Sequence, residues 1–287
     1  MADELKGIPK VNPLTICFLT ALVEAELLRF EALIQTRGWT EKLPISQGLK
    51  KAGVREWTKE ITGYTVRAFS GAISGMGQTR SAIETMGFLS RCKPEIIVLC
   101  GIAGSLEHAP GTAGQGDPEI AKRDVVVATG VHWRMQNRLT AGDPCDQYRV
   151  SNYPSHMLDA DVTVDIGRFL DSSFGRPVEQ GYKVVPGEIF TWDYVLNSSA
   201  KADVLKHDFP NALCVEMEGG AFMASVERYN TIHQADVLPF IVRGISDYAR
   251  KKDSVPADRM AAIRNASEVA IDLGEHMMAR FIRHLDD

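Results

Sequence analysis

The sequence predicts an α/β fold in which helices cover both faces of a twisted, mixed or mostly parallel sheet. Short apolar runs that are typical of buried strands alternate along the chain with stretches in which apolar residues recur at helical spacing. Consecutive apolar positions within a strand are typical of sheets that are covered on both faces. The chain has 287 residues, of which 45 % are hydrophobic and 24 % charged, as in ordinary globular proteins. We therefore expect residues 1–287 to form a single domain, with residues 1–12 as an N-terminal extension.

The expected strands are short apolar runs that end at a glycine or at polar residues. In chain order they are residues 14–19, 64–73, 96–100, 124–129, 182–185, 213–217 and 238–245. The clearest of them is 96–100, which we expect to end at Gly101. The expected helices are residues 23–34, 78–91, 157–171, a helix from 219 onward, and a long amphipathic helix over 259–285. Stretches rich in glycine and proline at 106–122 and 140–154 are predicted to be loops.

Composition and charge narrow the classes of function. The net charge is −5 and the sequence pI is near 5.8, which disfavours a broad surface for nucleic acid or an anionic membrane. No apolar run reaches the about 18 residues of a membrane helix, and the first residues lack an apolar signal segment, so we expect a cytoplasmic protein. The cysteines lack metal-ligand spacing, and Cys17, Cys100 and Cys214 lie in apolar runs where buried free thiols are expected. The sequence therefore indicates no metal and no organic cofactor.

Acidic side chains follow two of the apolar strands. Glu216 and Glu218 close one strand and are followed by small residues, which would let a ligand approach the backbone. Ser246 and Asp247 end the last strand, just after Arg243. A buried carboxylate is costly unless it is paired or used, so both segments predict a site at the strand ends. Each also has a purely structural interpretation, because a glutamate, serine or aspartate at such a position can cap the helix that follows.

Two glycine pairs and one further carboxylate lie after other strands. Gly75 and Gly77 form one pair, and Gly101 and Gly104 form the other; taken alone, each pair is typical of a tight turn. Glu24 follows the first strand among apolar residues, where a solvated acid in a first helical turn is the ordinary interpretation. The order of these segments along the chain carries more information than any one of them.

Together and in this order, five segments resemble the purine nucleoside phosphorylase and nucleosidase superfamily. They are SGMG at 74–77, GIAG at 101–104, PGEIF at 186–190, VEMEG at 215–219 and RGISD at 243–247. The methylthioadenosine/S-adenosylhomocysteine nucleosidases are the most similar group, and the resemblance runs from Leu14 to Leu285. It implies a single three-layer α/β/α domain around a mixed sheet, cleavage of the bond between a purine and its sugar, and assembly into a dimer or hexamer.

The resemblance also implies a role for each matching residue. Asp247 would protonate N7 of the departing purine, which requires a protonated carboxyl group near neutral pH; burial favours that form. Glu218, with Glu216 and the backbone of Met217, would hold the ribose hydroxyls and stabilise positive charge on the sugar. Glu24 would orient the attacking water. The other residues expected to contact the substrate, with the phenylalanine stacked on the purine, are Ala103, Gly104, Ile189, Phe190 and Ser246.

Water rather than phosphate is the expected nucleophile. Phosphorylases similar to this chain place an arginine two residues before the first glycine of the GIAG segment, and a serine or threonine just after it. Here these positions are Leu99 and Ile102, whose side chains cannot bind phosphate. Two alternatives stay open, namely a phosphate-dependent phosphorylase and a nucleoside-binding module without catalytic activity.

Basic residues in unusual places bear on the 5′ substituent of the substrate. Arg134 and Arg138 follow a strand end, Arg250 lies just after the RGISD segment, and Arg243 begins it. Such cations are commonly solvated, but here Arg134, Arg138 and Arg243 are also candidates to bind a 5′-phosphate or polyphosphate. The substrate would then be a nucleotide such as AMP or ATP, and its cleavage would deplete nucleotides, as in related bacterial domains of phage defence. The expected partner is a small purine nucleoside or nucleotide, not a nucleic acid or a membrane.

Overall fold

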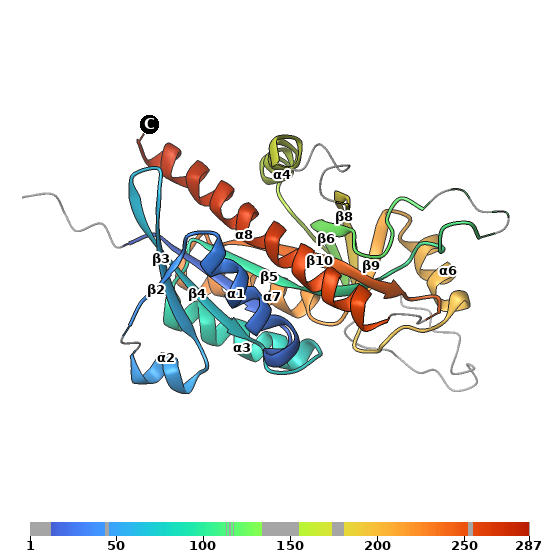
Figure 1. Cartoon of the computed structure of the whole chain (residues 1–287), viewed down its shortest axis with the longest axis horizontal. Helices are drawn as coiled ribbons and strands as arrows, with labels where there is room; N and C mark the ends of the chain where they lie inside the picture. Colours follow the sequence, from blue (N-terminus) through green and yellow to red (C-terminus); the bar gives the residue numbers. More distant parts are fainter. Residues whose placement is uncertain are drawn as a thin grey trace, which may run out of the picture.

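The computed structural model describes residues 13–43, 46–112, 114, 116, 118–133, 155–173, 181–251 and 255–286. In this part of the chain, ten strands form one mixed sheet and helices pack on both of its faces (Figure 1). The predicted fold class is therefore confirmed. The expected extension at 1–12 and the expected loop at 140–154 lie outside the described residues.

The elements follow one another along the chain much as the alternating pattern predicted. The strands are β1 (Thr15–Thr20), β2 (Thr40–Glu41), β3 (Arg55–Ile61), β4 (Tyr64–Ala72), β5 (Ile96–Ser105), β6 (Val125–Trp133), β7 (Ser155–Met157), β8 (Val184–Thr191), β9 (Ala212–Glu216) and β10 (Leu238–Tyr248). The helices are a π-helical turn η1 (Val23–Leu27), then α1 (Leu28–Thr36), α2 (Gln47–Lys51), α3 (Gln78–Cys92), α4 (Ala160–Ser173), α6 (Ser199–Asp208), α7 (Gly219–His233) and α8 (Pro256–Asp286).

Five of the strands close into a ring. β10 pairs with β5 in parallel and with β6 in antiparallel orientation, and the pairs β6–β8, β8–β9 and β9–β5 complete the circle. β1, β4, β3 and β2 extend from β5 as an open wing, and β7 pairs with β6 outside the ring. The sheet is thus closed at one end and open at the other, which hydrophobic periodicity alone could not predict because it carries no information about strand pairing.

The core lies on both faces of the central strands. Phe18 of β1 and Val98 of β5 pack with side chains of α1 and α8, whereas their neighbours Leu19 and Leu99 pack with side chains of α3 and α7. Successive side chains of a strand point to opposite faces, so an unbroken apolar run buries both faces at once. This explains why all six residues of β1 are buried.

Four strands, β5, β6, β8 and β10, continue well past the ends that the sequence pattern predicted. β5 runs through the GIAG segment to Ser105, and β10 runs through Asp247 to Tyr248. The expected strand end at Gly101 is therefore wrong. β10 lies parallel to β5 along its whole length and keeps supplying hydrogen-bond partners beyond that glycine. Elements with weak apolar patterns, namely β2, β3, β7, α2 and α6, were not predicted.

The described cysteines are consistent with the sequence expectation. Cys17, Cys92, Cys100 and Cys214 are buried and free, which confirms the prediction for the three in apolar strands. Over the described ranges, no group of three potential ligands could hold a metal ion, and no helix is long and apolar enough to cross a membrane.

Candidate active site

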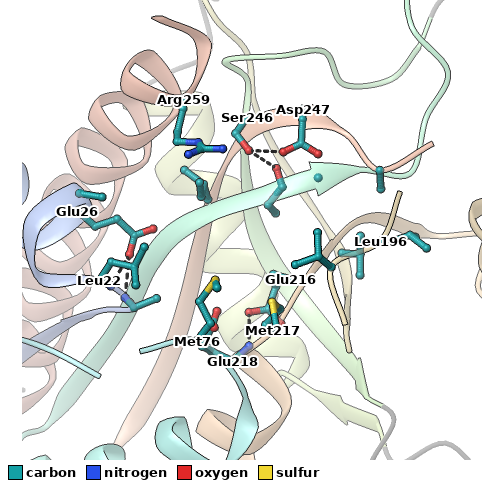
Figure 2. A pocket seen from close by; sticks show the side chains of 18 of the residues that line it. Leu22, Glu26, Met76, Leu196, Glu216, Met217, Glu218, Ser246, Asp247 and Arg259 are labelled. Atoms are coloured by element: carbon teal, nitrogen blue, oxygen red, sulfur yellow. Dashed lines mark hydrogen bonds between the residues drawn. The ribbon is translucent and has the colours of Figure 1, made fainter. Parts of the chain in front are cut away.

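A cavity of about 350 Å³ lies beside the crossing of β5 and β10, close to the start of α8 (Figure 2). It brings together residues from four of the motifs that were singled out in the sequence. These residues are Met76 of the SGMG segment, Ala103 and Gly104 of β5, Glu216, Met217 and Glu218 at the end of β9, and Ser246 and Asp247 of β10. Segments more than a hundred residues apart in the chain therefore meet in one cavity, as the resemblance implied.

Glu216 forms a buried ion pair with Arg243. Its Oε2 accepts a hydrogen bond from Nη2 of Arg243 at 2.5 Å, and both side chains are 1 % exposed. The same carboxylate accepts from the backbone N–H groups of Glu218 and Gly219 and from the hydroxyl of Thr191. A buried charge is tolerated when it is paired and hydrogen-bonded in this way. Through these bonds Glu216 fixes the turn and the arginine. It also lines the cavity, and the contact with ribose that the resemblance implied stays a prediction.

Glu218 keeps one oxygen for a ligand. Its Oε1 accepts from the backbone N–H of Gly77 at 3.0 Å, while its Oε2 lies 3.5 Å from Nη2 of Arg243. Gly77 has φ = +100°, a conformation that favours glycine, so the SGMG segment serves to present this N–H at the start of α3. Burial, and then the neighbouring charge of Glu216, raise the pKa of Glu218 to about 7.

Glu26 faces Arg243 across Gly101. A Cβ atom added to Gly101 would lie 2.4 Å from Nη1 of Arg243 and 3.1 Å from Oε1 of Glu26, so both groups converge on the space above this glycine. Oε2 of Glu26 is held by the backbone N–H groups of Ala21 and Leu22 at 2.8 and 3.0 Å. Burial raises the pKa of Glu26, and Arg243 opposes the shift. Nη1 and Nε of Arg243 have no hydrogen-bond partner in the described part of the chain, so two of its donor atoms are buried and unpaired there.

Arg243 remains charged in spite of its complete burial. Desolvation opposes the charge, but Glu216, Glu218 and Glu26 together raise the pKa of Arg243. The guanidinium of Arg243 therefore lies among three carboxylates, those of Glu216, Glu218 and Glu26. Its engagement with these carboxylates, and its burial outside the lining of the cavity, argue against the sequence interpretation of Arg243 as a phosphate ligand.

Asp247 and Ser246 reach the cavity through an irregularity in β10. The register with β5 shifts between Ile245 and Asp247, so the strand carries one extra residue there. Such a bulge re-aims side chains, and both neighbours line the cavity instead of facing opposite sides of the sheet. Oδ2 of Asp247 accepts from the Ser246 hydroxyl at 2.8 Å. A Cβ atom on Gly104 would lie 3.0 Å from Oδ1 of Asp247, so this glycine leaves room for the carboxyl group.

Glu24 does not lie in the cavity, and Glu26 takes its place. The side chain of Glu24 is exposed, whereas Glu26 is 3 % exposed and lines the cavity. The first turn after β1 is π-helical over Val23–Leu27. A π-helix has more residues per turn than an α-helix, so the residue that returns to face the strand end comes later in the sequence. The sequence interpretation chose Glu24 because helical spacing alone does not reveal this wider turn.

Phe190 and Ile189 are also away from the cavity. Ile189 is fully buried in the core beside α7, and Phe190 packs against Phe209 with ring centroids 5.2 Å apart. Their strand β8 belongs to the ring and pairs at its edges with β6 and β9, and the side chains of Ile189 and Phe190 are buried in separate hydrophobic clusters on its two faces. The stretch after β8 supplies the lining instead, through Tyr194, Val195 and Leu196. The predicted stacking of Phe190 on a purine therefore has no support in its position.

The other predicted cations do not reach the cavity or cannot be placed. Arg134 and Arg138 lie outside the described residues. Arg250 donates from Nε to the backbone oxygen of Leu106 and forms an ion pair with Asp203. The cation that does line the cavity is Arg259, near the start of α8, which the sequence interpretation missed. Its signal in the sequence was weak, because a lone arginine in the first turn of an amphipathic helix is usually solvated.

Comparison with known proteins agrees with the geometry. The sequence profile of the phosphorylase superfamily matches residues 16–283. This chain belongs to that superfamily. The match covers the strands, the cavity and most of α8, so every motif that was singled out in the sequence lies within it.

Solved structures of nucleosidases share the fold of this superfamily member. Futalosine hydrolase of Helicobacter pylori is 17 % identical, with a TM-score of 0.62, and the match covers 92 % of this chain and 97 % of that one. The 5′-methylthioadenosine/S-adenosylhomocysteine nucleosidase of Neisseria meningitidis, solved with methylthio-immucillin-A, is 19 % identical, with a TM-score of 0.59 and coverages of 92 % and 98 %. The corresponding protein of Colwellia psychrerythraea, solved with adenine, is 18 % identical, with a TM-score of 0.58 and coverages of 93 % and 95 %.

Proposed function

We propose that the protein hydrolyses the N-glycosidic bond of a purine nucleoside or nucleotide and releases the free purine. The observation that carries this proposal is the placement of Glu26 and Asp247 on different sides of one cavity (Figure 2). A sugar placed between them would meet a water molecule on one face and direct its purine toward the carboxyl group of Asp247.

The reaction follows from these positions. Protonated Asp247 donates to N7 of the purine as the bond from C1′ to N9 breaks, and the bonding electrons leave with the base. The sugar is left with positive charge shared by C1′ and the ring oxygen, which the negative charge of Glu218 stabilises. Water held by Glu26 attacks C1′ and gives its proton to Glu26. Proton exchange with solvent then restores both carboxyl groups.

Water is favoured over phosphate by the charges around the nucleophile. Glu26 and Glu218 both lie on this side of the cavity, and a phosphate dianion beside them would be repelled. Leu99 packs in the core with side chains of α3 and α7, and Ile102 presents an apolar side chain to the cavity. Neither can offset that repulsion, which supports hydrolysis.

One assay separates the three candidate activities. The purified protein is incubated with adenosine, methylthioadenosine, AMP or ATP, with and without inorganic phosphate, and the purine and the sugar product are quantified. Hydrolysis predicts free purine and a reducing sugar at a rate independent of phosphate. A requirement for phosphate with release of ribose 1-phosphate would establish a phosphorylase, and binding without base release would establish a nucleoside-binding module.

The nucleotide substrates in this assay also test a physiological role. Cleavage of AMP or ATP would deplete the nucleotide pool, which is the basis of the phage-defence hypothesis. Assembly into a homo-oligomer is a further expectation from the resemblance, and light scattering after size-exclusion chromatography measures it.

A further inference from the structure

Arg259 is the one lysine or arginine among the described residues that line the cavity. The same lining carries four carboxylates, from Glu26, Glu216, Glu218 and Asp247. An uncharged nucleoside needs the carboxylates, for its hydroxyl groups, its base and the attacking water, but it has no group that requires a cation. Arg259 therefore remains unexplained by the proposed hydrolysis.

No described neighbour of Arg259 provides a structural reason for an arginine at this position. It lies near the start of α8, which begins at Pro256, and a cation close to the positive end of a helix dipole is unfavourable. Within the described ranges its guanidinium has no ion pair and no side-chain hydrogen bond, whereas Arg264 on the same helix pairs with Glu268. A free guanidinium directed at a cavity presents a planar fork of donors that fits a phosphate.

The cavity continues past Arg259 into a second hollow of about 400 Å³. The two spaces share Ala25, Arg259 and Ile263, so Arg259 lies where one opens into the other. Arg29 also lines the second hollow, with its Nη1 hydrogen-bonded to the backbone oxygen of Ala25. Both arginines lie at the outer side of the site, where a substituent that projects from the bound nucleoside would emerge.

The orientation of the ribose connects this position to the 5′ carbon. In a ribonucleoside, C5′ and the base project from one face of the ribose ring, and the 2′- and 3′-hydroxyls project from the other face. Figure 2 shows Glu218 and Met217 on one side of the cavity and Arg259 on the opposite side. With the hydroxyls held at Glu218, the 5′ substituent is directed toward Arg259.

We propose that Arg259 binds the 5′-phosphate of the substrate, so that the preferred substrate is a purine nucleoside 5′-phosphate. This inference rests on the proposed glycosidase function and assigns its substrate class. Arg259 determines specificity and takes no part in bond cleavage. Because Arg259 is exposed to solvent, its attraction to phosphate is screened by salt and weakens as ionic strength rises.

The test compares AMP with adenosine in the full-length wild type and in Arg259→Ala, Arg259→Lys and Arg264→Ala. Loss of one charge-assisted contact to phosphate predicts that the ratio of kcat/KM for AMP to that for adenosine falls about 10- to 100-fold in Arg259→Ala. The lysine variant should recover part of this ratio, since it keeps the charge but not the fork of donors. Arg264→Ala is the matched control and should leave the ratio within about twofold, because its arginine lies on the solvent side of the same helix.

Failure of the inference and failure of the glycosidase function give different results. A wild type that cleaves adenosine at least as well as AMP, or an Arg259→Ala ratio within about twofold of wild type, overturns the phosphate site and leaves the glycosidase intact. If no substrate releases its purine, the glycosidase function fails, and calorimetric titration with AMP and adenosine then decides the inference. Tighter binding of AMP that Arg259→Ala removes supports the site, and equal affinities overturn it.

Discussion

Replacing Glu26 with glutamine removes the proposed proton acceptor while preserving the local hydrogen bonds. Oε2 of Glu26 accepts from the backbone N–H groups of Ala21 and Leu22, and the amide oxygen of glutamine can accept both. The amide NH₂ group then occupies the position of Oε1 and directs its hydrogens toward Nη1 of Arg243 across Gly101. The amide N–H donor of glutamine would then face the N–H donor of Arg243, whereas the wild type has an acceptor, Oε1 of Glu26, at that position.

The expected loss follows from the role of this carboxylate. A positioned general base contributes about 10²- to 10⁴-fold to a rate, so we expect kcat to fall about 10³-fold, equivalent to ~4 kcal/mol of activation free energy. KM should change much less, because Glu26 faces the water side of the sugar whereas Glu218 is the group placed to bind the hydroxyls. A rise in KM with unchanged kcat would instead indicate a role in substrate binding.

The assay measures purine release at saturating concentration of the substrate that the wild type cleaves fastest. Glu24→Gln is the matched control, because it makes the same chemical change two residues earlier on an exposed side chain. We expect its kcat to stay within about threefold of wild type, as for most surface substitutions. The reasoning is refuted if Glu24→Gln loses activity while Glu26→Gln retains it, with thermal unfolding showing that both variants are folded.

Three further predictions test the remaining parts of the site. The Asp247→Asn variant cannot protonate the base, so its kcat should fall about 10³-fold, while adenine binding measured by calorimetry should persist. An unchanged kcat would show that Asp247 is not the acid. Gly101→Ala places a Cβ atom 2.4 Å from Nη1 of Arg243, so kcat should fall at least about tenfold and the melting temperature should drop, and wild-type values for both would contradict the close approach. In a pH profile, kcat/KM should decline as the pH is lowered through about 7, because protonation of Glu218 removes the negative charge beside the sugar; a profile without this step would argue against that role.

Much of the site was predictable where function depends on residues that are close in sequence. The VEMEG and RGISD segments each place an acid just after a buried apolar run, and both acids line the cavity. A strand carries its terminal residues to the sheet edge whatever the rest of the fold does, so Glu218 and Asp247 could be chosen from local pattern. The ordered motifs also indicated the superfamily, which the match over 16–283 confirms.

The choice between neighbouring residues could not be made from the sequence. Glu24 and Glu26 are both plausible from their spacing, and only the π-helical turn over Val23–Leu27 decides which one faces Gly101. Phe190 matches its motif, yet its side chain is buried in a hydrophobic cluster against Phe209. In both cases the answer depends on the direction in which a side chain points, which backbone geometry and packing set together.

The sequence by itself determined the α/β architecture, the superfamily and two of the acids, because apolar periodicity and strand-end motifs are local properties of the chain. The tertiary structure decided the rest of the chemistry. It buried Phe190 against Phe209, engaged Arg243 with Glu216, and brought Arg259 from α8 to the rim of the cavity. These outcomes depend on contacts between segments far apart in the chain, and the free energy that fixes them comes from burial and charge pairing that exist only once the chain has folded.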